Sequence, residues 1–211
     1  MGSVWVIVVA AGSGSRFGTP KQYEDLGGRR VLDWSLAVGR DVADGVVAVV
    51  APDRLDTPEP GADTVVAGGA TRSASVRAGL AAVPDDADVV VVHDGARPLA
   101  GAELFARVVE AVREGADAAV PAVEVTDTLR HRSGAPVDRG ELVAVQTPQA
   151  FRAAALRRAH AGEPEATDDA SLIEAAGGKV VVVEGSPANL KITRPVDLIV
   201  AEALLRRGTP P

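Results

Sequence analysis

Short runs rich in β-branched residues, separated by stretches of helical periodicity, constrain the fold of this chain most strongly. The runs lie at residues 4–9, 46–50, 89–93, 118–125 and 180–183. Such apolar runs are typical of strands that are buried on both faces of a parallel sheet. The spacing of apolar residues predicts helices at residues 31–42, 71–83, 101–114, 150–160, 168–176 and 195–207. This alternation predicts an α/β fold, Rossmann-like and three-layered, with a mixed, mainly parallel sheet.

One segment breaks the pattern. Residues 126–141 read TDTLRHRSGAPVDRGE, which is polar and charged, with a turn signal at Ser133-Gly134. Because it has too little apolar surface to lie in the core, we interpret it as the tip of a protruding β-arm at about residues 124–145. No repeat or linker divides the rest of the chain. We therefore expect one domain over residues 1–211.

Composition excludes several classes of function. The chain has 22 Lys and Arg against 29 Asp and Glu, a net charge of −7, and only six aromatic residues. This balance argues against nucleic acid as a partner. The absence of cysteine excludes disulfides, thiol nucleophiles and cysteine-ligated zinc. The longest apolar run, Val4 to Ala11, is far shorter than the roughly 20 residues of a membrane helix. We expect a soluble, cytoplasmic protein with no membrane partner.

A glycine-rich segment follows the first predicted strand. Residues 10–18 read AAGSGSRFG, and Pro20-Lys21-Gln22 come next. Glycines at this position let backbone N–H groups approach phosphate oxygens, and Arg16 and Lys21 add positive charge for a triphosphate. The glycine spacing matches neither the Rossmann fingerprint nor a Walker loop. The alternative interpretation is a tight turn with two solvated cations.

Two further segments end in polar or small residues where predicted strands end. Gly68-Gly69 exposes backbone that can hydrogen-bond the edge of a pyrimidine and exclude a purine by shape, although Ser75 beyond it could simply face solvent. Asp94 follows the run at 89–93, where open α/β sheets bind ligands, and Mg²⁺ needs only one such carboxylate beside phosphate oxygens. His93 is more typical of a buried strand end than of a catalyst.

The C-terminal third contributes one further cation. Lys191 is flanked by apolar residues, so we expect its side chain to point into the site. Helix caps are sufficient to explain Thr167 and Thr193, with Pro195 in the first turn of the last helix.

Together these segments resemble the 2-C-methyl-D-erythritol 4-phosphate cytidylyltransferase family. The motifs that carry the resemblance, in chain order, are AAGSGSRFG with PKQ, GGATR at 68–72, HDGARP at 93–98, Asp127-Thr128, QTPQ at 146–149, TDDAS at 167–171 and Lys191-Ile192-Thr193. They span residues 4 to about 198. The resemblance implies a nucleotidyltransferase fold in which the arm crosses into a second subunit and makes a homodimer.

The resemblance also implies roles for individual residues. The catalytic cations are Arg16, Lys21 and Lys191. The residues that bind the nucleotide are Ala10, Ala11, Gly12, Gly14, Gly69, Ala70 and Ser75. The residues that bind the sugar phosphate are Asp94, Thr128, Arg139, Thr147 and Thr167, with Asp94 also holding Mg²⁺ and with Thr128 and Arg139 reaching the partner's substrate. Ala70 stands where the family often has a polar residue, so its contact is limited to the backbone.

The expected reaction joins CTP and 2-C-methyl-D-erythritol 4-phosphate to give 4-diphosphocytidyl-2-C-methyl-D-erythritol and pyrophosphate, in non-mevalonate isoprenoid synthesis. Three alternatives stay open on the sequence. They are a cytidylyltransferase for ribitol 5-phosphate, a nucleotidyltransferase that joins another nucleotide to a sugar 1-phosphate, and a nucleotide-binding module without catalysis.

Overall fold

The computed structural model describes residues 2–14 and 17–208 of the 211-residue chain, and an eight-stranded sheet forms its centre. The strand order is β10-β7-β9-β6-β1-β4-β5, and β8 pairs with β7 outside this path. The strands of this sheet are β1 Val4–Ala10, β4 Gly45–Val50, β5 Thr64–Ala67, β6 Val89–Asp94, β7 Ala118–Glu124, β8 Val143–Val145, β9 Gln149–Arg152 and β10 Val180–Glu184. A separate ribbon pairs β2 Asp25–Leu26 with β3 Arg29–Arg30.

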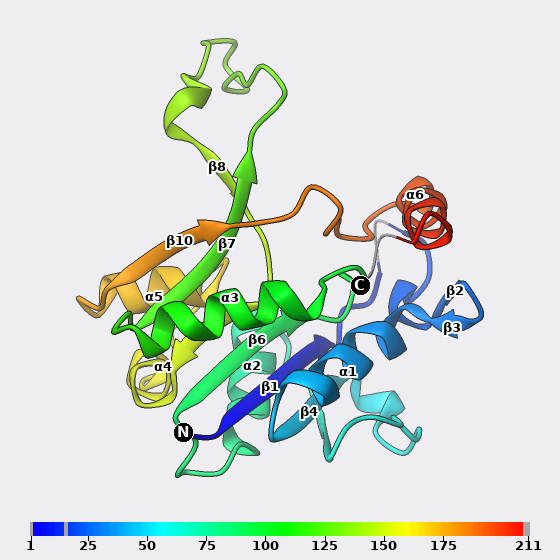
Figure 1. Cartoon of the computed structure of the whole chain (residues 1–211), viewed down its shortest axis with the longest axis vertical. Helices are drawn as coiled ribbons and strands as arrows, with labels where there is room; N and C mark the ends of the chain where they lie inside the picture. Colours follow the sequence, from blue (N-terminus) through cyan, green and yellow to red (C-terminus); the bar gives the residue numbers. More distant parts are fainter. Residues whose placement is uncertain (1, 15–16, 209–211) are drawn as a thin grey trace.

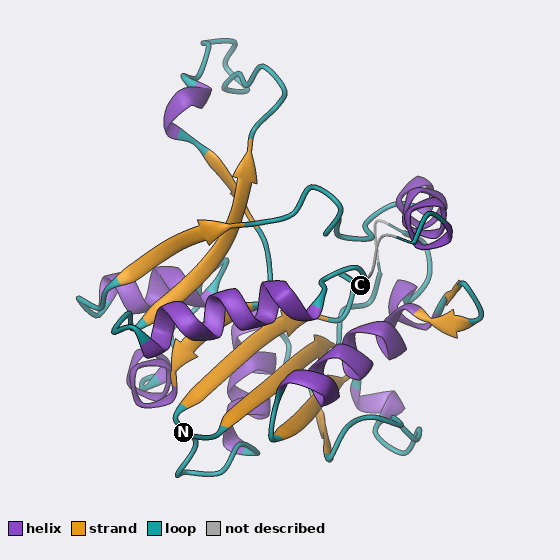
Figure 2. Cartoon of the chain, viewed as in Figure 1, coloured by secondary structure: helices purple, strands orange, loops and turns teal. Residues whose placement is uncertain are grey.

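Helices cover both faces of the sheet (Figures 1 and 2). The α-helices are α1 Val31–Val42, α2 Arg72–Ala81, α3 Ala102–Arg113, α4 Ala153–His160, α5 Asp169–Ala175 and α6 Pro195–Arg206. The short 3-10 helices are η1 Lys21–Tyr23, η2 Pro52–Arg54 and η3 Arg139–Glu141. Side chains of α1 and α3 pack on one face of the sheet, and those of α2, α4 and α5 pack on the other. The three-layer α/β prediction is confirmed.

The strands alternate their side chains between two apolar cores. In β1, Val6 and Val8 belong to the core under α1 and α3, whereas Ile7 belongs to the core under α2 and α4. All three side chains are fully buried. This burial on both faces explains why the sequence of β1 is continuously apolar.

The direction of the strands places one set of strand ends at a single edge. β6, β1, β4 and β5 are mutually parallel neighbours, and β7 is parallel to β10. β9 lies between β6 and β7 and is antiparallel to both. The carboxyl ends of the six parallel strands therefore share one edge with the amino end of β9, which is the edge where open α/β sheets bind ligands.

Three local predictions differ from the structure. Residues 150–152 belong to β9 rather than to a helix, because they form ladder hydrogen bonds with β6 and β7 that local periodicity does not reveal. The N-cap of α6 is Arg194 rather than Thr193; the Asp197 carboxylate accepts hydrogen bonds from the backbone nitrogens of both. The N-cap of α5 is Asp168 rather than Thr167.

The segment between β7 and β8 projects beyond the rest of the chain, at the top of Figure 1. Its base is an antiparallel pair in which Ala122 faces Val145. At its tip the predicted turn is confirmed, since Gly134 has a φ of 102° and its backbone nitrogen donates to the oxygen of His131. In the described ranges, no helix is both long enough and apolar enough to cross a membrane.

Candidate active site

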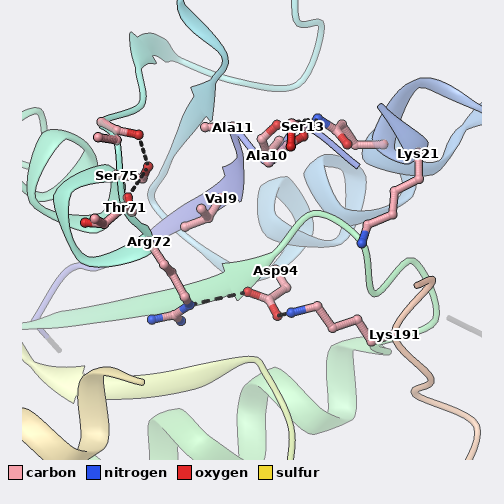
Figure 3. A pocket seen from close by; sticks show the side chains of 14 residues that line it. Val9, Ala10, Ala11, Ser13, Lys21, Thr71, Arg72, Ser75, Asp94 and Lys191 are labelled. Carbon is pink, nitrogen blue, oxygen red and sulfur yellow. Dashed lines mark hydrogen bonds and ion pairs between the residues drawn. The ribbon is translucent and has the colours of Figure 1, made fainter. Parts of the chain in front are cut away.

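A cavity of about 420 Å³ opens at the carboxyl edge of the sheet. The residues that line it come from the end of β1 and the loop after it, from η1, from the loop between β5 and α2 and the start of α2, from the end of β6 and from the loop before α6 (Figure 3). They are Val9, Ala10, Ala11, Gly12, Ser13, Lys21, Gln22, Gly69, Ala70, Thr71, Arg72, Ser75, Asp94 and Lys191. Segments that are distant in sequence thus meet at one place.

The loop after β1 depends on a glycine. Gly14 has a φ of 70°, and a Cβ there would lie 1.8 Å from the backbone oxygen of Thr19. The Gly14 oxygen accepts hydrogen bonds from the backbone nitrogens of Phe17 and Gly18, at 2.8 and 2.9 Å. Gly14 shapes the loop without lining the cavity, whereas Gly12 lines it. The predicted catalytic residue Arg16 lies outside the described residues.

Gln22 ties η1 to this loop. Its side chain is 3% exposed, and its Nε2 donates to the oxygens of Ala10 at 2.7 Å and Gly12 at 2.9 Å. These two bonds hold η1 against the end of β1. Lys21, the preceding residue, consequently extends into the cavity (Figure 3).

The second loop lies between β5 and α2. Gly69 is required by close packing, because a Cβ there would lie 2.5 Å from the Cβ of Ala74. The Ser75 hydroxyl donates to the Thr71 oxygen at 2.9 Å. Ser75 is buried among the cavity residues, so the alternative that it simply faces solvent is wrong.

Asp94 lies at the centre of the site between two cations (Figure 3). Lys191 Nζ is 2.6 Å from Asp94 Oδ2, and Arg72 Nε is 3.8 Å from Oδ1. Burial favours the neutral carboxyl, but the charges of Lys191 and Arg72 outweigh it and lower the pKa of Asp94 to about 2. Asp94 is therefore a fixed negative charge at neutral pH.

The neighbours of Asp94 hold its backbone. Thr147 Oγ1 accepts a hydrogen bond from the Asp94 backbone nitrogen at 3.0 Å and lies 3.2 Å from His93 Nδ1. His93 is fully buried, and burial lowers its pKa to about 4. The interpretation of His93 as a buried strand-end residue is confirmed, and the neutral ring carries no charge into the site.

A second cavity, of about 180 Å³, lies beside the first. It shares Arg72, Asp94 and Lys191 with the first cavity. The remaining residues that line it are Arg97, Val145, Gln146, Thr147, Gln149, Thr167 and Asp168. Two substrates bound in the two cavities would thus meet at the same three charged side chains.

Comparison with known proteins gives one family. The model of the family described as 2-C-methyl-D-erythritol 4-phosphate cytidylyltransferase matches residues 4–207. The chain is 47% identical to the protein of that name from Rhodococcus jostii (strain RHA1), over 98% of this chain and 97% of the relative. The crystal structure of the cytidylyltransferase from Thermus thermophilus superposes with a TM-score of 0.84 at 42% identity, covering 98% of this chain and all of that one.

The chain belongs to the 2-C-methyl-D-erythritol 4-phosphate cytidylyltransferase family. It is therefore a nucleotidyltransferase, and the Rossmann-like fold predicted from the sequence is the fold of this family. Domains of this family also occur within longer proteins. One is the bifunctional enzyme of Solidesulfovibrio magneticus, 42% identical over 99% of this chain and 58% of that protein.

The predicted residues of the cytidylyltransferase site fall into two groups. Apart from Gly14 and the undescribed Arg16, those placed on the sheet edge all line one of the two cavities. Thr128 and Arg139 do not: both are exposed on the arm, where Arg139 donates to the backbone oxygen of Thr126. Their predicted contact with substrate is therefore not made within this chain as the structure describes it.

The donor set of the cytidylyltransferase site suits a magnesium ion held mainly by substrate. No group of three or more His, Cys, Asp or Glu side chains in residues 2–14 and 17–208 is placed to hold a metal. Mg²⁺ is commonly bound through one or two carboxylates together with phosphate oxygens. Within the described ranges Asp94 Oδ1 accepts no hydrogen bond, so this oxygen is available to a ligand.

Sequence reasoning missed three side chains of the site. Arg72 belongs to both cavities, Arg97 lines the second, and Gln22 fixes the first loop. Each stands inside a motif that the sequence presents. Position alone could have identified Arg72, because it follows a predicted strand end and opens a helix. The tasks of Arg97 and Gln22 depend on packing between distant segments.

The two hydrogen bonds of Gln22 give a stability prediction. Gln22→Leu removes both donors from a buried place, and we expect the free energy of unfolding to fall by about 1–3 kcal/mol in urea denaturation. Gln149→Leu is the matched control. Among the residues that the structure describes, the Gln149 amide makes one hydrogen bond, at 3.4 Å, so its loss is expected to cost less than about 1 kcal/mol. Equal losses for the two variants would contradict the role given to Gln22.

Proposed function

We propose that this chain transfers the cytidylyl group of CTP to 2-C-methyl-D-erythritol 4-phosphate, releasing pyrophosphate. The observation that carries the proposal is the meeting of the two cavities at Arg72, Asp94 and Lys191. A nucleotidyl transfer needs two phosphate-bearing substrates to approach at one point. The names of the relatives, which cover nearly the whole chain, supply the identities of the two substrates.

The larger cavity suits the nucleotide. Its first wall is the glycine loop after β1, whose backbone N–H groups can approach phosphate oxygens, with Lys21 beside them. Its second wall is the backbone of residues 69–71, which can hydrogen-bond the edge of cytosine, with Ser75 behind it. Arg16 adds a further positive charge to the triphosphate in this proposal.

The chemistry is in-line substitution at phosphorus. An oxygen of the acceptor phosphate forms a bond to the α-phosphorus of CTP, while the bond from that phosphorus to the bridging oxygen breaks and pyrophosphate leaves. A phosphate monoester is already ionised near neutral pH, so no general base is required. This agrees with the buried position of His93, whose pKa is lowered by burial.

The protein contributes positioning and charge neutralisation. Lys21, Lys191 and Arg72 surround the region where negative charge increases on the α-phosphate and the leaving group. Asp94 holds Lys191 through a close ion pair and attracts Arg72 from a longer distance. In the proposed mechanism Asp94 would also hold Mg²⁺, and the ion would further neutralise the charge of the phosphate oxygens.

We propose that the active enzyme is a homodimer in which each arm completes the neighbouring site. Thr128 and Arg139 are exposed and do not line the cavities of their own chain. An arginine binds a phosphate through two parallel hydrogen bonds, which suits the acceptor phosphate. Exposed apolar side chains at Leu142, Val143 and Val145 on the returning strand offer surface for the contact between subunits.

The acceptor is tested by measuring pyrophosphate release from CTP and Mg²⁺. The proposal predicts release with 2-C-methyl-D-erythritol 4-phosphate, and little with ribitol 5-phosphate or without acceptor. Release with ribitol 5-phosphate alone would retain the chemistry and replace the acceptor. A folded protein that binds CTP but releases no pyrophosphate with either acceptor would instead be a nucleotide-binding module.

Lys21 is tested by truncation. We expect Lys21→Ala to lower kcat on the order of 10²–10³-fold, because it removes one preorganised cation from the reacting phosphates. Lys179→Ala is the matched control, since Lys179 is exposed and precedes β10 at the opposite edge of the sheet. Near-normal turnover of folded Lys21→Ala would remove Lys21 from the mechanism.

The shared site is tested by mixing two variants at a sugar-phosphate concentration at which neither turns over appreciably alone. Arg139→Ala is expected mainly to raise the KM for the sugar phosphate and to leave CTP binding unchanged. When Arg139→Ala and Lys21→Ala subunits exchange, each mixed dimer has one site with both intact residues. Random exchange should then restore about a quarter of the normal activity. No recovery after verified subunit exchange would rule out a borrowed arm.

A further inference from the structure

Behind the site, a buried carboxylate joins Arg72 to a histidine. Asp169 is the first residue of α5 and is 0% exposed. Its Oδ2 lies 2.7 Å from Arg72 Nη1, and its Oδ1 lies 3.0 Å from His160 Nε2. His160 is itself buried at the end of α4. Three helices thus contribute one residue each to a chain of contacts that ends at the cavity.

Both neighbours of Asp169 favour its charged form. Burial alone would raise the pKa of Asp169, but the hydrogen bond from His160 and the charge of Arg72 outweigh it and lower the pKa. The carboxylate is therefore ionised and uses one oxygen for each partner. The hydrogen bond from His160 to Oδ1 orients the carboxylate, and this orientation directs Oδ2 toward Arg72.

On its other side Arg72 faces Asp94. The distance from Arg72 Nε to Asp94 Oδ1 is 3.8 Å, longer than a hydrogen bond. Arg72 is thus attracted by the carboxylates of both Asp94 and Asp169. It donates a hydrogen bond to Asp169, which lies outside the cavities. Without the charge of Asp169, Arg72 would be drawn onto Asp94 and would cover the oxygen that is available to ligands.

We propose that Asp169 and His160 are positioning residues, which hold Arg72 at the boundary between the two cavities and keep it from closing on Asp94. The proposal rests on the proposed function, because its effect is on phosphate groups that meet at that boundary. Asp169 and His160 themselves line neither cavity. They act only through Arg72, and this separates them from the residues that touch substrate.

A double-mutant cycle tests the proposal. We expect Asp169→Asn to lower kcat/KM by about tenfold to a hundredfold, as small displacements of a positioned group do, and to weaken CTP binding severalfold in calorimetry. In an Arg72→Gln background the same substitution should change both quantities less than about twofold, because the residue that it positions is gone. Equal effects in both backgrounds, or no effect in either, would overturn the proposal.

Matched variants separate positioning from general destabilisation. Glu59 is another buried carboxylate; it lies 2.7 Å from Arg30 and lines neither cavity. Glu59→Gln therefore makes the same chemical change and should leave kcat/KM within about twofold. If Asp169→Asn fails to fold, two substitutions of His160 test the proposal instead. His160→Gln can still donate a hydrogen bond to Asp169 and should keep its kcat/KM, whereas His160→Leu cannot and its kcat/KM should fall severalfold. Equal activity of these two variants would overturn the proposal.

The binding measurement keeps the two proposals distinguishable. If the unmodified protein binds CTP but transfers nothing, the proposed function fails. The CTP affinities of the four proteins in the double-mutant cycle then still show whether Asp169 acts through Arg72. Coupling in affinity would support the positioning role without turnover, and additive effects on affinity would contradict it.

Discussion

The site depends on the ion pairs that the carboxylate of Asp94 makes. A buried charge is costly unless it is paired, so Asp94 requires Lys191 and Arg72 beside it. These two cations come from separate segments, one before Asp94 in the chain and one far after it, and each lines both cavities. The ion pairs that offset the cost of burying the Asp94 charge therefore also gather the positive charge that a nucleotidyl transfer needs.

The sheet makes this gathering possible. The parallel strands β1, β5 and β6 end at one edge, so that the loops that follow them face one another across the first cavity. The antiparallel strand β9 adds the second cavity, because the segment before it, with Thr147, comes to the end of β6. An antiparallel insertion in a parallel sheet thus places a second cavity beside the first.

Much of the fold, and two charged residues of the site, could be predicted from local sequence. The five apolar runs and the helices at 31–42 and 101–114 follow from periodicity. Asp94 stands out at the end of an apolar run, and Lys191 stands out by its apolar neighbours. The strand β9 could not be found, because four residues carry little periodicity and their pairing with β6 and β7 decides the outcome. The role of Asp169 and His160 could not be predicted for the same reason. Asp169 meets Arg72 and His160 only in the folded chain.

A crystal structure with a non-hydrolysable CTP analogue, Mg²⁺ and 2-C-methyl-D-erythritol 4-phosphate tests this arrangement most directly. We expect cytosine against the backbone of residues 69–71 and the acceptor phosphate in the second cavity. The α-phosphate should lie between Lys191 and Arg72, with Arg72 still bonded to Asp169. An α-phosphate bound away from the shared boundary, or an acceptor outside the second cavity, would contradict it.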